Sequence, residues 1–167
     1  MISSMRKTIV SALLIFILLV GGYLFYDFKI NKPKKEYYKN LSPKDLDPES
    51  FITLFSERYN KGLTNFVTLS GEFPENWVKA NDIQYLISIM HSKQKCCGYM
   101  NIFSSQISND NAEVGGFAII FLNSYISQTK IKLGLNCNPK VDVASIKKIE
   151  TWYKKQMNNN QPINLKV

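Results

Sequence analysis

Residues 110–128 have the sequence DNAEVGGFAIIFLNSYISQ, and this stretch decides which fold class the chain can adopt. Asp110 and Glu113 have the spacing of a capping box, in which side chains satisfy the free N–H groups at a helix start. The following residues are apolar nearly all round a helix, which is typical of a buried helix. The stretch therefore predicts a central helix whose main stripe consists of Val114, Phe117, Ala118, Phe121, Leu122 and Tyr125.

A β-hairpin is the alternative interpretation of the same region. Gly115 and Gly116 would form a turn, residues 117–125 a buried strand, and residues 129–135 a second strand with alternating apolar side chains. This alternative gives an α+β fold with a hairpin around 117–135. Length favours the helix, because strands usually end within about eight residues whereas helices begin at about ten.

The flanking segments also have helical patterns. An Asp-Pro pair at 47–48 supplies a capping oxygen and a proline for the first turn, and apolar residues recur at three-four spacing over 51–59. Residues 83–90 and 144–157 show the same spacing, the latter after Asp142 as a cap. The chain is therefore predicted to be mainly α, with one small helical domain around a single core.

Nearer the N-terminus, residues 8–26 (TIVSALLIFILLVGGYLFY) contain no charge. As a helix this run would measure roughly 29 Å, close to the ~30 Å hydrocarbon thickness of a bilayer. A cleavable signal peptide is one alternative, but only Val20 and Gly22 approach the small residues that a cleavage site needs. A buried helix of a soluble protein is the other, but core helices rarely lack any polar face. We therefore expect a transmembrane signal anchor with membrane contacts at Thr8, Leu13, Phe16, Leu19 and Tyr26.

The orientation of this anchor depends on two opposing signals. The lysines between 29 and 39 outnumber Arg6 and Lys7, which by charge alone favours a cytoplasmic C-terminus. A short tail before a long apolar run is instead typical of an export signal, and long domains cross the membrane largely regardless of charge. We expect a single-pass protein with an extracytoplasmic domain. The predicted segments are 1–7 (tail), 8–26 (signal anchor), 27–45 (basic linker), 46–157 (compact domain) and 158–167 (flexible tail).

The net charge of +8 is spread along the chain. Lysines in the linker would be attracted to anionic lipid head groups, so the lipid bilayer is one expected partner. Nucleic-acid binding would need a basic patch with interleaved aromatic residues or a known module, and the sequence contains neither. The charge therefore predicts no nucleic-acid partner.

Three cysteines, Cys96, Cys97 and Cys137, are the most reactive residues of the chain. In an oxidising compartment Cys96 or Cys97 could form a disulfide with Cys137, closing a loop of about 40 residues. Free thiols in a reducing compartment are the alternative. A zinc site is not expected, because the two adjacent cysteines lack the paired spacing of zinc ligands and His91 is the only histidine.

The sharpest enzymatic hypothesis is a thiol nucleophile at Cys96 or Cys97 with His91 as its base. Nothing else in the sequence supports catalysis: a glycine-rich phosphate loop, a nucleophile elbow and a metalloprotease motif are all absent from it. We therefore expect no catalytic, cofactor-binding or metal-binding residues, and no enzyme.

The remaining function is binding. The sequence predicts a membrane-anchored, non-catalytic interaction module at the bacterial cell envelope, with a protein partner of unknown identity. An immunity protein or an accessory subunit would have this architecture, although architecture alone is a weak guide to function. The alternative is a thiol-dependent enzyme or redox protein that uses Cys96 or Cys97 with His91.

Overall fold

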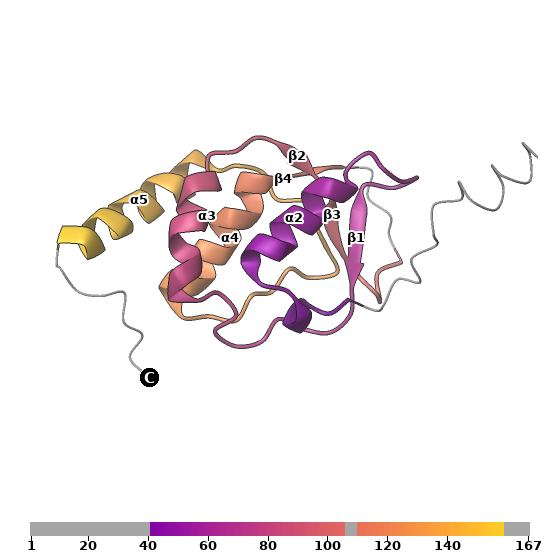
Figure 1. Ribbon diagram of the computed structural model, residues 1–167, viewed down its shortest axis with the longest axis horizontal. Helices are drawn as coiled ribbons and strands as arrows, with labels where there is room; N and C mark the ends of the chain where they lie inside the picture. The colour runs from indigo at the N-terminus through magenta and orange to yellow at the C-terminus, as the bar shows by residue number, and fades with distance from the viewer. Residues whose placement is uncertain (1–40, 106–109, 159–167) are drawn as a thin grey trace, which may run out of the picture. The chain divides into compact units, whose positions relative to one another are not determined.

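The computed structural model describes residues 41–105 and 110–158, and within them the chain forms helices and short strands (Figure 1). The α-helices are α2 (Pro48–Arg58), α3 (Ile83–Ile89), α4 (Val114–Ser127) and α5 (Val143–Asn158), with short 3₁₀ turns at Pro43–Asp45 and Ala80–Asp82. The strands are β1 (Phe66–Leu69), β2 (Lys95–Cys96), β3 (Gly98–Asn101), β4 (Ala112–Glu113) and β5 (Asn136–Cys137).

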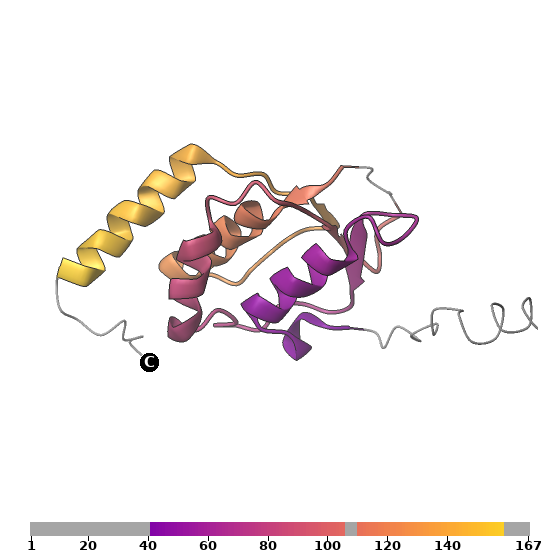
Figure 2. The ribbon, with the colours of Figure 1, turned by 45° about the horizontal axis from the view of Figure 1, so that its top comes forward.

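The strands form two small sheets. In the larger sheet β3 lies in the centre, parallel to β1 and antiparallel to β5, with Tyr99 opposite both Val67 and Cys137. In the smaller sheet β2 pairs antiparallel with β4, with Cys96 opposite Ala112. The chain passes through α3 between β1 and β3, as parallel pairing requires a long crossover. Figures 1 and 2 both place α5 at the end of the domain opposite β1 and β3.

The prediction of a mainly α fold is wrong, because two sheets accompany the helices. The strands are only two to four residues long, too short to produce a recognisable alternation in the sequence. The hairpin around 117–135 is also wrong, since residues 117–125 lie inside α4. The strands instead come from segments that pair across long separations in sequence.

The central helix α4 is confirmed, but it begins differently from the prediction. Glu113 is its N-cap residue, and no side chain caps the helix, so the capping box of Asp110 and Glu113 does not form there. The N–H groups of Val114 and Gly115 instead donate to the carbonyls of Gln94 and Ser92, at 3.0 and 2.9 Å. Backbone carbonyls from the segment after α3 therefore satisfy two of the free donors of α4.

Two glycines in the first turn of α4 permit this close approach. A Cβ atom at Gly115 would lie 2.5 Å from the carbonyl oxygen of Met90, and one at Gly116 would lie 2.5 Å from that of Pro139. Both distances are well inside van der Waals contact with backbone atoms, which move less easily than a side chain. The glycine pair therefore marks a contact between a helix and two backbone segments, and not a turn.

The core is dominated by aromatic rings around Phe51. Its ring centroid lies 3.9 Å from that of Phe55, and 5.1 and 5.2 Å from those of Phe121 and Phe117 on α4. The rings of Phe73 and Trp77, in the loop before α3, lie 6.1 Å away. One side chain of α2 therefore contacts both the central helix and the long loop.

Trp77 ties the start of the described chain to this core. Its indole Nε1–H lies 2.8 Å from the carbonyl oxygen of Pro43 and 2.7 Å from that of Leu46. The 3₁₀ turn at Pro43–Asp45, within the predicted linker 27–45, is thus held against the folded domain. A buried tryptophan usually finds a partner for its N–H group, and here that partner is backbone.

Two predicted helix starts are confirmed. The Asp47 carboxylate accepts from the N–H of Ser50 at 2.7 Å, and that of Asp142 accepts from the N–H of Ser145 at 2.8 Å. In both cases hydrogen bonds from the serine lower the pKa of the carboxyl group, because they stabilise its charged form. The starts of α2 and α5 are thus set by local sequence.

The transmembrane prediction requires a correction. Within residues 41–105 and 110–158, no helix is long and apolar enough to cross a membrane, and the buried helix α4 has only 14 residues. The described residues therefore supply no transmembrane helix, and the single-pass localisation stays a prediction of the sequence. Residues 8–26, with the anchor positions Thr8, Leu13, Phe16, Leu19 and Tyr26, lie outside the described residues.

Replacing Phe51 by Ala should lower the free energy of unfolding by about 3–5 kcal/mol, because a fully buried ring is lost and a cavity remains. Urea denaturation followed by circular dichroism measures the change. Phe103→Ala removes the same atoms from an exposed position and should alter stability by less than about 0.5 kcal/mol. Equal losses in the two variants would contradict the central position of Phe51 in the core.

Candidate functional site

The three cysteines lie near the two sheets, and none lies at an open surface. Cys96 in β2 and Cys97 between β2 and β3 are fully buried, and the N–H of Cys97 donates to the carbonyl of Phe55 at 2.9 Å. Cys137 is half-buried in β5. The sequence alone gave no indication of this burial, because it depends on strand pairing.

Burial makes these thiols poor nucleophiles. It raises the pKa of Cys96 to about 12, with a further increase from neighbouring Cys97, and it also raises the pKa values of Cys97 and Cys137. A nucleophilic cysteine needs the opposite shift, because the thiolate is the reactive form. Burial therefore lowers the thiolate fraction that the thiol-enzyme hypothesis requires.

His91 is engaged elsewhere. Its side chain is 60% exposed, and Nε2 lies 3.2 Å from Oε1 of Glu150 on α5. This contact joins the end of α3 to α5, which packs against α4. His91 therefore contributes to the docking of a helix, and the structure does not assign it as the base of a thiol.

All three cysteines are free thiols in the structure. Cys137 pairs with Tyr99 of β3, and Cys97 lies just before β3 begins at Gly98. The disulfide of Cys137 with Cys96 or Cys97 stays a prediction.

Among residues 41–105 and 110–158, no group of three or more His, Cys, Asp or Glu residues is arranged to hold a metal ion.

The most distinctive surface feature is a turn at the end of β3 that exposes apolar side chains. Ile102 is 47% exposed and Phe103 is 85% exposed, while Leu135, just before β5, is 58% exposed. The N–H of Asn101 donates to the carbonyl of Leu135 at 2.8 Å, which places all three at the same end of the larger sheet. We call Ile102, Phe103 and Leu135 the apolar turn.

Hydrogen bonds fix the backbone of the apolar turn. The Asn101 side-chain oxygen accepts from the N–H of Phe103 at 2.9 Å, and the Asn101 carbonyl accepts from the N–H of Ser104 at 2.9 Å. The Ser104 hydroxyl donates to the side-chain oxygen of Asn136 on β5 at 2.8 Å. The side-chain NH₂ of Asn101 also donates to the hydroxyl oxygen of Tyr99 at 3.2 Å. The turn therefore presents Phe103 from a pre-organised backbone, which lowers the entropy cost of a contact.

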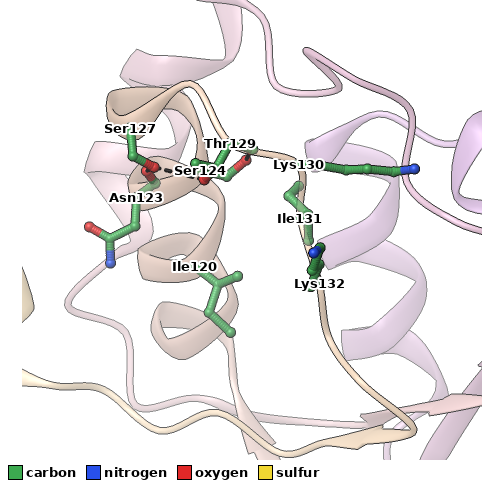
Figure 3. A pocket seen from close by; sticks show the side chains of 8 residues that line it. All are labelled: Ile120, Asn123, Ser124, Ser127, Thr129, Lys130, Ile131 and Lys132. Atoms are coloured by element: carbon green, nitrogen blue, oxygen red, sulfur yellow. Dashed lines mark hydrogen bonds between the residues drawn. The ribbon is translucent and has the colours of Figure 1, made fainter.

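A second feature is an open groove of about 620 Å³ beside α4 (Figure 3). Ile120, Asn123, Ser124 and Ser127 of α4 form one side, and residues 129–132 form the other. Figure 3 shows residues 129–132 leaving the end of α4 and running back along the helix. The groove thus lies between a helix and the segment that follows it.

Polar groups close the groove where the two sides meet. The N–H of Thr129 donates to the carbonyl of Ser124 at 3.0 Å, and the hydroxyls of Ser127 and Thr129 are 2.8 Å apart. Gln128, with a φ of 53°, makes the sharp reversal after α4. This reversal sets the separation between α4 and the returning segment.

Comparison with protein-family models, curated proteins and solved structures gives no match to this chain. The geometry of the described residues is therefore the basis for any functional proposal.

Sequence reasoning missed both surface features. Ile102 and Phe103 have the composition of core residues, and their exposure depends on the turn that Asn101 stabilises. The alternating pattern of 129–135 predicts a strand paired with residues 117–125, but those residues lie in α4 and 129–135 belongs to neither sheet. An Asn directly before an apolar pair was the available signal for the turn, because Asn side chains often bond their own backbone two residues ahead.

The thiols should react slowly in the native protein. With a pKa of about 12, Cys96 has a thiolate fraction of about 10⁻⁴ at pH 8, and this fraction rises with increasing pH. In the fully reduced chain, we expect alkylation of Cys96 and Cys97 by iodoacetamide to be much slower than after unfolding in urea, as measured by mass spectrometry. His91→Ala should leave both rates unchanged. Fast alkylation that His91→Ala slows would support the thiol enzyme instead.

Proposed function

We propose that this domain is a non-catalytic protein-binding module whose contact surface is centred on the apolar turn. The observation that carries the proposal is the presentation of Phe103, 85% exposed, on a backbone fixed by Asn101 and Ser104. Exposed apolar clusters on otherwise polar surfaces mark interaction sites, and aromatic residues contribute strongly to protein interfaces.

The surroundings of Phe103 favour a protein partner over a small molecule. Ile102 and Leu135 are exposed beside it, so the feature projects outward and is not a cavity. Small ligands are usually enclosed by concave sites, whereas a projecting aromatic residue fits a pocket on a partner surface. The apolar turn would then be the anchor that enters the partner.

The thiol-enzyme alternative has less support. Burial of Cys96 and Cys97 and the contact of His91 with Glu150 leave no exposed thiol–imidazole pair among the described residues. The location of the domain outside the cytoplasm, and an immunity or accessory role there, stay predictions of the sequence.

Phe103→Ser should remove the anchor and weaken partner binding by at least about tenfold, corresponding to about 1.4 kcal/mol or more. The measurement is affinity capture with the full chain from cells that produce it, followed by quantitative mass spectrometry and titration of the captured proteins. Thermal unfolding establishes that Phe103→Ser is folded.

Leu63→Ser is the matched control, because Leu63 is a fully exposed apolar residue in the connection between α2 and β1. Proteins retained by the wild type and by Leu63→Ser but lost with Phe103→Ser would support the proposal. Retention of the same proteins at the same affinity by Phe103→Ser would overturn it.

A further inference from the structure

The groove beside α4 has an unpaired backbone along one side. Residues 130–133 alternate between exposed and buried, with Ile131 and Leu133 facing the core and Lys130 and Lys132 exposed. This alternation is that of a β-strand. Within the described part of the chain, however, residues 130–133 belong to neither sheet, and none of their backbone groups bonds to another backbone group. They have the side-chain pattern of a strand without its ladder.

The groove provides space beside this unpaired segment. Its volume of about 620 Å³ lies between residues 129–132 and α4, where Ile120 is half-buried (Figure 3). Strands pair at about 4.7–4.9 Å, and an added strand exchanges backbone hydrogen bonds with the segment that it joins. An unpaired strand is a ready template for another extended chain.

The charged side chains beside the groove indicate which charge a bound peptide would carry. Lys130 is neutralised by an ion pair with Glu72, and in Figure 3 its side chain points away from α4. Lys132 makes no ion pair or side-chain hydrogen bond within the described residues. Glu72 thus faces two lysines, because Lys132 also helps to lower the pKa of its carboxyl group, after the larger effect of Lys130. One carboxylate against two ammonium groups leaves a net positive charge beside the groove, which favours an acidic chain.

We propose that this groove is a second binding site, which accepts an extended acidic peptide segment as a strand paired with residues 130–133. Backbone hydrogen bonds to the segment supply sequence-independent affinity. A carboxylate of the peptide pairs with Lys132, and alternate apolar side chains lie over Ile120. Asn123 and Ser127 at the edge of α4 provide further polar contacts.

A phage-displayed library of random dodecapeptides, selected on the full chain, tests the proposal. We expect enrichment of sequences in which Asp or Glu alternates with β-branched or aromatic residues. A fluorescein-labelled copy of an enriched peptide then gives the affinity by anisotropy. On binding, hydrogen exchange of alternate amides within residues 130–133 should slow at least tenfold, which contact through side chains alone would not cause.

Variants separate the contributions of backbone and charge. Lys132→Pro removes a backbone donor and should weaken peptide binding at least tenfold, whereas Lys132→Ala keeps the donor and should weaken it less and reduce its salt dependence. Ile120→Arg fills the groove from α4 and should also prevent binding, so it tests the site if Lys132→Pro does not fold. Circular dichroism and thermal unfolding establish which variants are folded.

This site is independent of the apolar turn. Phe103→Ser should leave peptide affinity unchanged, so failure of one proposal is distinguishable from failure of the other. Enrichment of no peptide, or of peptides whose affinity is unaffected by Ile120→Arg, would overturn the groove proposal. Unchanged exchange at residues 130–133 in the bound state would also overturn it.

Discussion

The packing of aromatic rings around Phe51 is the interaction on which the rest of the domain depends. This residue stacks on Phe55 in α2 and contacts Phe117 and Phe121 of α4, which makes two helices share one apolar centre. Trp77 extends the cluster through the loop and binds the carbonyls of Pro43 and Leu46. A small domain gains much of its stability from a few large buried side chains, and here they come from segments that no local pattern connects.

The start of α4 is the second constraint, because backbone meets backbone there. Gly115 and Gly116 allow the helix to approach Met90 and Pro139, and the carbonyls of Ser92 and Gln94 accept from its first N–H groups. The Glu113 carboxylate also accepts a hydrogen bond from the N–H of Val141 at 2.8 Å. The same few residues therefore position the end of α3, the strands β2 and β4, and the approach to α5.

These two constraints place the thiols in the interior and leave other side chains at the surface. The strands bring Cys96 and Cys97 into the interior, where burial raises the pKa values of their thiols, and His91 serves to join α3 to α5. Two accessible features of the described residues are contact surfaces: the apolar turn beyond β3 and the groove beside α4. These surfaces are the basis of the two binding proposals, and the burial of the thiols removes support from the thiol-enzyme hypothesis.

Local sequence determined the helices of this protein. Asp47 and Asp142 cap α2 and α5, and the length and apolarity of 114–127 produce a buried helix, because capping and periodicity act within a few residues. Only the tertiary structure decided the strands, whose two to four residues form ladders by pairing with distant segments. It also decided the burial of the cysteines, the exposure of Phe103 and the open groove, since each depends on which segments become neighbours. Amino-acid composition cannot specify which segments become neighbours in space. The burial, exposure and pKa of each side chain follow from that arrangement.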